Sequence, residues 1–119
     1  NFWPILNLKP NYCGFTIHLM NTGIDSGPIL YSDNIDARDF ELSYPKVNNF
    51  CIKKAVEALP YIIKNQHNLK PVNQWAKGIN FRNLDFDGYV CFKYYLIRKK
   101  FTKNKNKINF HITKPKTIR

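Results

Sequence analysis

The chain has few of the features that mark membrane, disulfide-bonded or zinc-binding proteins. No apolar run in its 119 residues approaches the roughly 18 residues of a membrane helix, and no signal peptide is visible. Its three cysteines form no C-x-x-C pair, which argues against a zinc site, and an odd, scattered set fits reduced thiols. We therefore expect a cytoplasmic protein with no metal site and no membrane partner.

Linkers and repeats are also absent. No Gly/Ser-rich segment and no internal repeat divides the 119 residues, which are enough for one small domain with a modest core. The first residue is not Met. Organisation therefore has to be inferred from local patterns.

Acidic residues are missing from the last part of the chain. Residues 88–119 contain ten Lys and Arg and no Asp or Glu, whereas residues 1–87 contain nine cations and eight acids. Four aromatic side chains are interleaved with the late cations: Phe92, Tyr94, Tyr95 and Phe101. Such a pattern could bind RNA through phosphates and base stacking. Alternatively, the lysines belong to a chain-wide excess of Asn, Lys and Ile, typical of an AT-rich genome, and the tail is simply solvated. On this second interpretation no specific nucleic acid is expected.

Two short strands are predicted near the amino end. Phe15–Ile17 is β-branched and aromatic and leads into His18, while Ser26–Pro28 is a turn signal followed by the apolar Ile29–Tyr31. His18 would end the first strand, and Asp25 would lie at the base of the loop, seven residues further on. Loops carried by a rigid sheet often hold functional sites. On spacing alone, the two remain equally compatible with ordinary polar residues at strand ends.

A long amphipathic helix is predicted after a polar connection over residues 34–42. Ser43 is a plausible N-cap and Pro45 fits the first turn. Apolar residues recur at three- and four-residue steps, a stripe expected to pack on the sheet: Val47, Cys51, Ala55, Ala58, Leu59 and Ile62, widened by Phe50, Val56 and Ile63. Pro60 should kink the helix or end it at Leu59, because it cannot donate to the carbonyl of Val56.

The remaining segments are less regular. Residues 69–87 suggest irregular or short extended structure, in which Trp75 is either a core anchor or a substrate platform. Residues 89–100 fit a helix or a strand equally, and residues from 104 onward suggest an extended tail. His67 and His111 are expected at the surface.

The segment 14–30 resembles the fingerprint of the formyltransferases that use 10-formyltetrahydrofolate. The matching positions are Gly14, Thr16, His18, Asp25, Gly27 and Ile29. Residues 2–7 are similar to the segment that leads into this fingerprint, and residues 77–86 to a late segment of several sugar-directed members. The strong resemblance covers about the first 35 residues.

The resemblance implies an α/β fold: the last strands of a Rossmann-like sheet, one long helix, and a basic, irregular or β-containing tail. In that family a parallel-sheet half precedes the fingerprint and ends in an Asn-x-His pair, which is not found upstream of the fingerprint here. We therefore expect the carboxyl-terminal portion of a longer protein, with residues 1–66 in the catalytic domain and residues 67–119 as a family-specific extension.

Formyl transfer to an amine needs a group that accepts the proton leaving the nitrogen. Asp25 is the only acid in the fingerprint, and the resemblance assigns it this role; His18 would orient it or adjust its pKa. The resemblance also implies that backbone groups of Asn21, Thr22, Gly23 and Ile24 hold the pterin ring of 10-formyltetrahydrofolate. Close backbone approach explains Gly23 in this hypothesis, although simple turn geometry explains Gly23 and Gly27 equally well.

The acceptor amine is predicted from weaker signals. His18 argues for a small amine, since the methionyl-tRNA branch usually lacks a His there, and residues 77–86 favour an amino sugar nucleotide. Glycinamide ribonucleotide and methionyl-tRNA remain alternatives, as does a non-catalytic basic module that binds RNA. A homodimer is compatible with the sequence. The resemblance implies that the upstream Asn-x-His pair donates hydrogen bonds to the oxyanion. Without this pair, we expect the 119-residue chain to be inactive alone.

Overall fold

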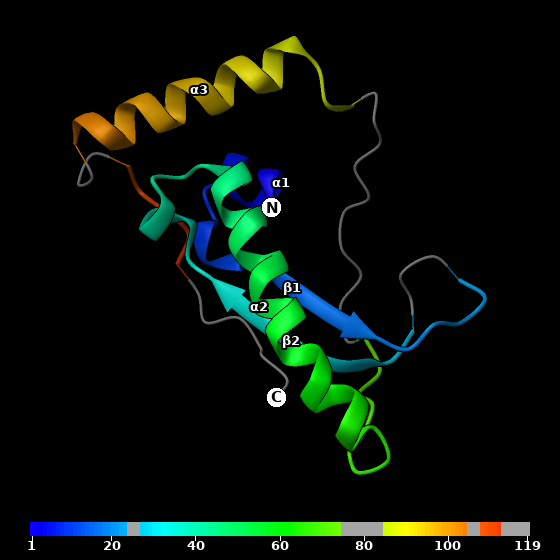
Figure 1. The fold of residues 1–119 in the computed structure, drawn as a ribbon. Helices are drawn as coiled ribbons and strands as arrows, with labels where there is room; N and C mark the ends of the chain where they lie inside the picture. The colour runs from blue at the N-terminus through cyan, green and yellow to red at the C-terminus, as the bar shows by residue number, and fades with distance from the viewer. Residues whose placement is uncertain (24–26, 75–84, 105–107, 113–119) are drawn as a thin grey trace.

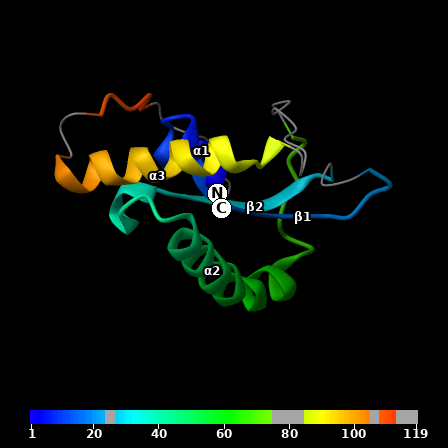
Figure 2. The same cartoon turned by 90° about the horizontal axis from the view of Figure 1, so that it is seen from above.

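A two-stranded antiparallel sheet lies at the centre of the computed structural model, which describes residues 1–23, 27–74, 85–104 and 108–112. Helix α2 covers one side of the strands, and α1 and α3 lie on the other side (Figures 1 and 2). The elements, in chain order, are α1 (Phe2–Leu6), a 3-10 turn (Pro10–Tyr12), β1 (Cys13–His18), β2 (Ile29–Ile35), a second 3-10 turn (Ala37–Phe40), α2 (Tyr44–Asn65) and α3 (Gly88–Lys103).

The strand pairing confirms the two predicted strands. It runs from Cys13 opposite Ile35 to His18 opposite Ile29, with one irregularity between Ile17 and His18. β2 extends beyond Tyr31 to Ile35, so the expected connection at residues 34–42 begins later than predicted and is largely a 3-10 turn. The result is an α/β arrangement compatible with a partial domain. Among the described residues there is no parallel strand pair of the kind expected in a Rossmann-like sheet.

Helix α2 begins where the sequence predicts and continues past Pro60. Ser43 is the N-cap residue, without a capping hydrogen bond from its side chain, and Pro45 lies in the first turn. The helix runs through Pro60 to Asn65, so an end at Leu59 is wrong. Val56, whose carbonyl would receive the missing N–H, is 59% exposed, so water can satisfy that carbonyl.

The apolar stripe of α2 is only partly covered. Val47, Cys51 and Ile62 are buried, while Leu59 is exposed. The predicted widening of the stripe is wrong for the exposed Val56 and Ile63, whereas Phe50 is half-buried and packs on Phe40. The 22 residues of α2 span about 33 Å, whereas the seven residues of β2 span about 23 Å. The strands are therefore too short to cover the whole helix.

The core joins all the regular elements. Its most buried residues are Ile5, Cys13, Ala37, Leu42, Val47, Cys51 and Phe101. At its edge, Asn1 donates from Nδ2 to Asn48 Oδ1 (2.8 Å) and accepts from the Gly14 N–H (2.9 Å). A single amide side chain thus ties the start of α1 to β1 and α2. Cys51 lies on the core face of α2, as predicted.

The segment that the sequence left open between helix and strand is the helix α3. Its N-cap is Asp87, whose carboxylate accepts from the Val90 N–H (3.0 Å). The Tyr94 hydroxyl accepts from the Tyr44 N–H (3.0 Å) and donates to the Leu42 carbonyl (2.9 Å). These two bonds fasten α3 to the start of α2.

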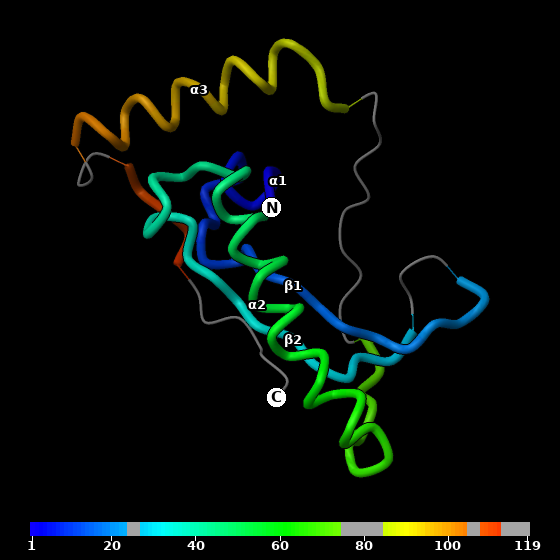
Figure 3. Tube along the Cα trace, viewed as in Figure 1, coloured from blue at the N-terminus to red at the C-terminus, as the bar shows by residue number. Residues whose placement is uncertain are grey.

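Residues 108–112 are neither helix nor strand and lie beside the Ala37–Phe40 turn (Figure 3). The His111 N–H donates to the Leu8 carbonyl (2.8 Å), while the His111 and His67 residues are exposed as expected. Trp75 and most of residues 77–86 lie outside the described residues. None of the helices that the structure describes has the length and apolarity to cross a bilayer.

Candidate functional site

His18 is the last residue of β1, where the sequence predicts it, and it is half-buried. Its Nδ1 lies 2.8 Å from the Leu19 carbonyl oxygen. Because a carbonyl only accepts hydrogen bonds, Nδ1 carries the hydrogen, and Nε2 is the accepting nitrogen of the neutral ring. The backbone thus fixes both the tautomer and the orientation of His18.

Gly27 packs directly against this arrangement. The residue is buried, and a Cβ built on it would lie 1.6 Å from the Leu19 carbonyl oxygen and 3.2 Å from His18 Nδ1. No side chain fits in that space, so only glycine lets the returning strand approach the end of β1 this closely. The sequence suggested only turn geometry for Gly27, whereas the structure shows that its close approach to the Leu19 carbonyl requires glycine.

A third segment, which the sequence did not predict at the site, supports the same loop. Gln74 donates from Nε2 to the Gly27 carbonyl (3.0 Å), and Val72 exchanges two backbone hydrogen bonds with Ile29 (2.6 and 2.8 Å). These contacts join segments more than forty residues apart in sequence. No local sequence pattern marks Gln74, because an isolated amide in an irregular segment has no periodicity to reveal its contact.

The predicted pterin-binding loop is exposed over residues 21–23. Gly23 donates its N–H to Asn21 Oδ1 (2.9 Å), a local turn closed by the Asn side chain. This turn places the backbone of Asn21, Thr22 and Gly23 at the surface. Ile24 and Asp25 lie outside the described residues, so the pairing of His18 with Asp25 stays a prediction.

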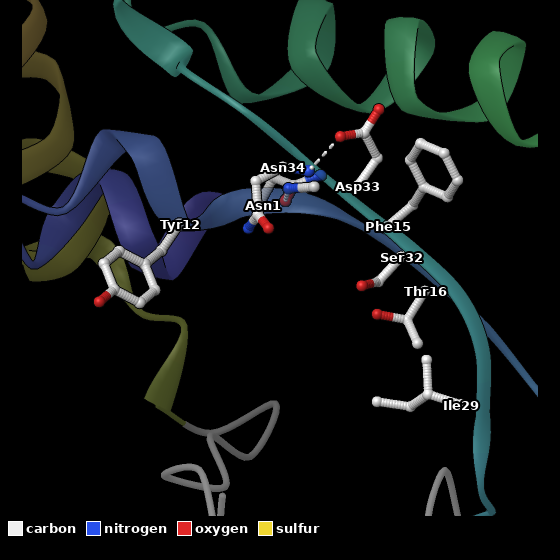
Figure 4. Close-up of a pocket in the computed structure, with 9 residues that line it drawn as sticks. Asn1, Tyr12, Phe15, Thr16, Ile29, Ser32, Asp33 and Asn34 are labelled. Atoms are coloured by element: carbon white, nitrogen blue, oxygen red, sulfur yellow. Dashed lines mark hydrogen bonds between the residues drawn. The ribbon is translucent and has the colours of Figure 1, made fainter. Parts of the chain in front are cut away.

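A cavity of about 280 Å³ opens on the sheet, away from this loop. Thr16, Ser32 and Ile29 point to one side of the strands, whereas Asp33 and Phe15 point toward α2 (Figure 4). The residues that line the cavity are Asn1, Tyr12, Gly14, Phe15, Thr16, Ile29, Ser32, Asp33 and Asn34. The cavity shares Gly14, Thr16 and Ile29 with the fingerprint but not His18. No local sequence pattern marks this cavity, because its walls come from three separate segments.

A larger cavity of about 620 Å³ lies between the Ala37–Phe40 turn and residues 108–112. Two of its charged groups are paired with each other: Arg38 donates to both carboxylate oxygens of Asp36, at 2.5 to 3.0 Å. Partial burial acts to raise the pKa of Asp36, but the hydrogen bonds from Arg38 outweigh it and hold that pKa below its ordinary value. A carboxylate held ionised in this way is a structural partner of Arg38 rather than a base.

Within the described residues, no three His, Cys, Asp or Glu side chains are placed together to bind a metal ion. Cys13, the first residue of β1, is buried, and desolvation raises the pKa of its thiol to about 12. Cys13 is therefore a protonated core residue and not a nucleophile.

Comparison with known proteins agrees with the general chemistry of the fingerprint. No protein-family model matches the chain, and no solved structure matches it. A methionyl-tRNA formyltransferase from Rickettsia massiliae (strain Mtu5) is 27% identical over 92 residues, which are 77% of this chain and 25% of the relative. The chain thus corresponds to about a quarter of the relative's length. It is similar to a formyltransferase, and the similarity does not extend to the sugar-directed subtype.

Proposed function

We propose that this chain takes part in transferring a formyl group from 10-formyltetrahydrofolate to an amine. The observation that carries the proposal is the meeting of two fingerprint residues, His18 and Gly27, at the end of β1. The similarity to a formyltransferase supports the same reaction class.

In the proposed reaction, the acceptor nitrogen attacks the formyl carbon, and the carbonyl oxygen becomes an oxyanion. The new C–N bond forms. When the oxyanion collapses, the bond to the folate nitrogen breaks and that nitrogen takes up a proton from water. The acceptor nitrogen must lose a proton. Asp25 accepts that proton, directly or through one water. His18, held by its Nδ1–H bond to the Leu19 carbonyl, offers Nε2 as an acceptor for the protonated carboxyl group. His18 thereby orients Asp25.

The loop would hold the folate ring by its backbone. Residues 21–23 are exposed beside the end of β1, and Ile24 completes the predicted segment. Exposed backbone N–H and C=O groups can pair with the edge of a pterin ring, which carries both donors and acceptors. In this proposal, the Gly27 contact keeps the loop close to His18.

For the acceptor, methionyl-tRNA is the first candidate, because the relative is named for that substrate. An amino sugar nucleotide is the second candidate, because a His at position 18 and the segment 77–86 resemble the sugar-directed members. Both acceptors present a primary amine to the same carboxylate, so the chemistry proposed for Asp25 is unchanged.

The proposal is tested with a chimeric enzyme in which this chain replaces the corresponding region of the Rickettsia massiliae relative. We expect formyl transfer from 10-formyltetrahydrofolate, and we expect Asp25→Asn to lower turnover by at least about a hundredfold, the scale of a lost acid–base group. Asp39→Asn is the matched control, because Asp39 is exposed on the Ala37–Phe40 turn. Its turnover should stay within about twofold of the parent, since a surface carboxylate away from the chemistry makes no such contribution.

The acceptor is assigned by assaying methionyl-tRNA and amino sugar nucleotides in parallel with the same chimera. Near-normal turnover of the Asp25→Asn enzyme would remove Asp25 from the mechanism. Equal losses in the Asp25 and Asp39 variants would show that the effect is one of folding or charge.

A further inference from the structure

Helix α3 has two different faces. Three residues of its inner face pack against the core and follow steps of three and four: Tyr94, Ile97 and Phe101. The outer face exposes four large side chains: Tyr89 (74%), Phe92 (58%), Tyr95 (55%) and Leu96 (46%). The four aromatic residues that the sequence interleaves with cations are therefore divided, because Tyr94 and Phe101 are used by the core while Phe92 and Tyr95 face outward.

The outer face changes character along the helix. Lys99, Lys100 and Lys103 follow Phe92 and Leu96 at steps of three and four, so they continue the same face, and all three are exposed. No Asp or Glu occurs in α3 to neutralise them. Arg98, by contrast, turns to the protein and donates to the Glu41 carbonyl (3.2 Å). The outer face thus has a mainly aromatic half, with the exposed Lys93 next to Phe92, followed by a cationic half.

We propose that this outer face of α3 binds single-stranded RNA without sequence preference. Flat aromatic rings offer stacking surfaces that every base can use, and lysines next to them meet the phosphates of the same strand. The positive charge complements the phosphates of a polyanion. The exposed rings can also stack on bases, which an anion without bases would not use. The proposal goes beyond formyl transfer and does not depend on it.

The distribution of charge favours a nucleic acid over a lipid surface. A helix that lies on a membrane keeps an apolar stripe along its length and places its cations toward the polar side. In α3, Lys99 and Lys103 continue the line of Phe92 and Leu96, so they would be directed into the bilayer. Double-stranded RNA is also disfavoured, because its bases are stacked internally and cannot cover Phe92 or Tyr95.

The cationic half is tested by titrating the 119-residue chain with a mixed-sequence single-stranded RNA of about 12 nucleotides, a length within the site sizes of such surfaces, at several salt concentrations. In the triple variant Lys99→Gln, Lys100→Gln, Lys103→Gln, we expect the slope of log K against log salt to become shallower by about 2, since each phosphate contact contributes about 0.7. The control neutralises three exposed lysines elsewhere: Lys53→Gln, Lys64→Gln, Lys70→Gln. It has the same net charge, and its slope should match the parent. Equal effects of the two variants would overturn the proposal, because they would show dependence on net charge alone.

The aromatic half is tested with Phe92→Leu combined with Tyr95→Leu, which keeps both positions apolar but removes the flat rings. We expect at least about fivefold weaker binding of single-stranded RNA, the low end of the effect of losing one stacked base. Thermal unfolding of each variant verifies the fold. Unchanged RNA affinity of the double variant would overturn the proposal. Duplex RNA that binds as tightly as the single strand would also overturn the proposal. So would binding to anionic phosphatidylserine vesicles that is tighter than binding to RNA and that the double leucine variant retains.

Discussion

At the scale of single residues, Gly27 decides whether the loop can close on His18. In Gly27→Ala, the added methyl carbon would lie 1.6 Å from the Leu19 carbonyl oxygen, so the strands must separate there. We expect the free energy of unfolding to fall by about 1 to 3 kcal/mol, the usual range for overpacking a close contact. Urea unfolding measures the change.

Gly88→Ala is the matched control for this substitution. A Cβ at Gly88 meets no atom within 4 Å, and the residue is the first of α3, so alanine should leave stability unchanged or raise it by up to about 1 kcal/mol. If Gly27→Ala is as stable as the parent, the close approach of Gly27 to Leu19 is not what shapes the loop.

Burial of Cys13 makes stability depend on alkaline pH. Desolvation raises the pKa of this thiol from its ordinary 9.0 to about 12, so the folded chain keeps a proton that the unfolded chain loses. The stabilisation is fully present below pH 9 and is lost as pH rises toward 12. We expect this group to lower the free energy of unfolding by about 1.4 kcal/mol per pH unit in that window.

Urea unfolding as a function of pH checks this expectation. Cys13→Ala removes the titrating group. Between pH 9 and pH 11, the free energy of unfolding of this variant should therefore fall less steeply with pH than that of the parent, by the slope that one proton contributes. Parallel declines in the two proteins would show that other groups account for the whole effect.

Local patterns were sufficient to predict some residues and not others. The position of His18 at a strand end follows from the strand pattern of its neighbours. The position of Cys51 on the core face of a helix follows from apolar residues repeating every three to four positions. Gln74 reaches Gly27 across 47 positions, a contact that depends on the path of the whole chain. Asp25 lies outside the described residues, so its role stays a prediction from the fingerprint.

At the scale of elements, α2 contains two prolines with opposite effects. Pro45 occupies the first turn, where no N–H is needed, whereas Pro60 lies inside the helix and leaves the Val56 carbonyl without its donor. We expect Pro60→Ala to raise the free energy of unfolding by roughly 1 to 3 kcal/mol. Pro45→Ala should lower it by about 0.4 to 1 kcal/mol, because the unfolded chain gains freedom.

Thermal and urea unfolding of the two variants, compared with the parent, measure both signs. A loss of stability in Pro60→Ala would contradict this expectation and would mean that the folded helix depends on Pro60. The sequence predicted an interruption here because propensity alone disfavours proline within a helix. The helix continues because burial of Ile62 beyond the proline favours it.

The element that the sequence could not assign is α3. Apolar residues occur on both of its faces, so neither a period of two nor one of 3.6 stands out. Tertiary contacts decide the matter: Tyr94 bonds to the start of α2 and Phe101 enters the core, which fixes one face inward. The apolar residues of the other face are left exposed, and they are the basis of the proposed RNA surface.

At the scale of the whole molecule, an α/β arrangement was predictable because each element has its own local signal. The Rossmann-like sheet came from the resemblance, and the described strands form an antiparallel pair that is compatible with a partial domain. β1 pairs with β2 along one edge, and within the described residues no strand pairs with the other edge of β1.

This arrangement leads to the prediction that the 119-residue chain alone does not transfer formyl groups. Asp25 and His18 supply only the proton-accepting part of the reaction, and the family's Asn-x-His donors for the oxyanion are not found upstream of the fingerprint. Preorganised oxyanion donors are often the largest single term in catalysis, and losing one lowers turnover by about a hundredfold to a thousandfold. The chain is assayed with 10-formyltetrahydrofolate and each acceptor beside the chimeric enzyme at equal concentration. We expect product only from the chimera; turnover by the chain alone above the uncatalysed background would mean that its own residues complete the site.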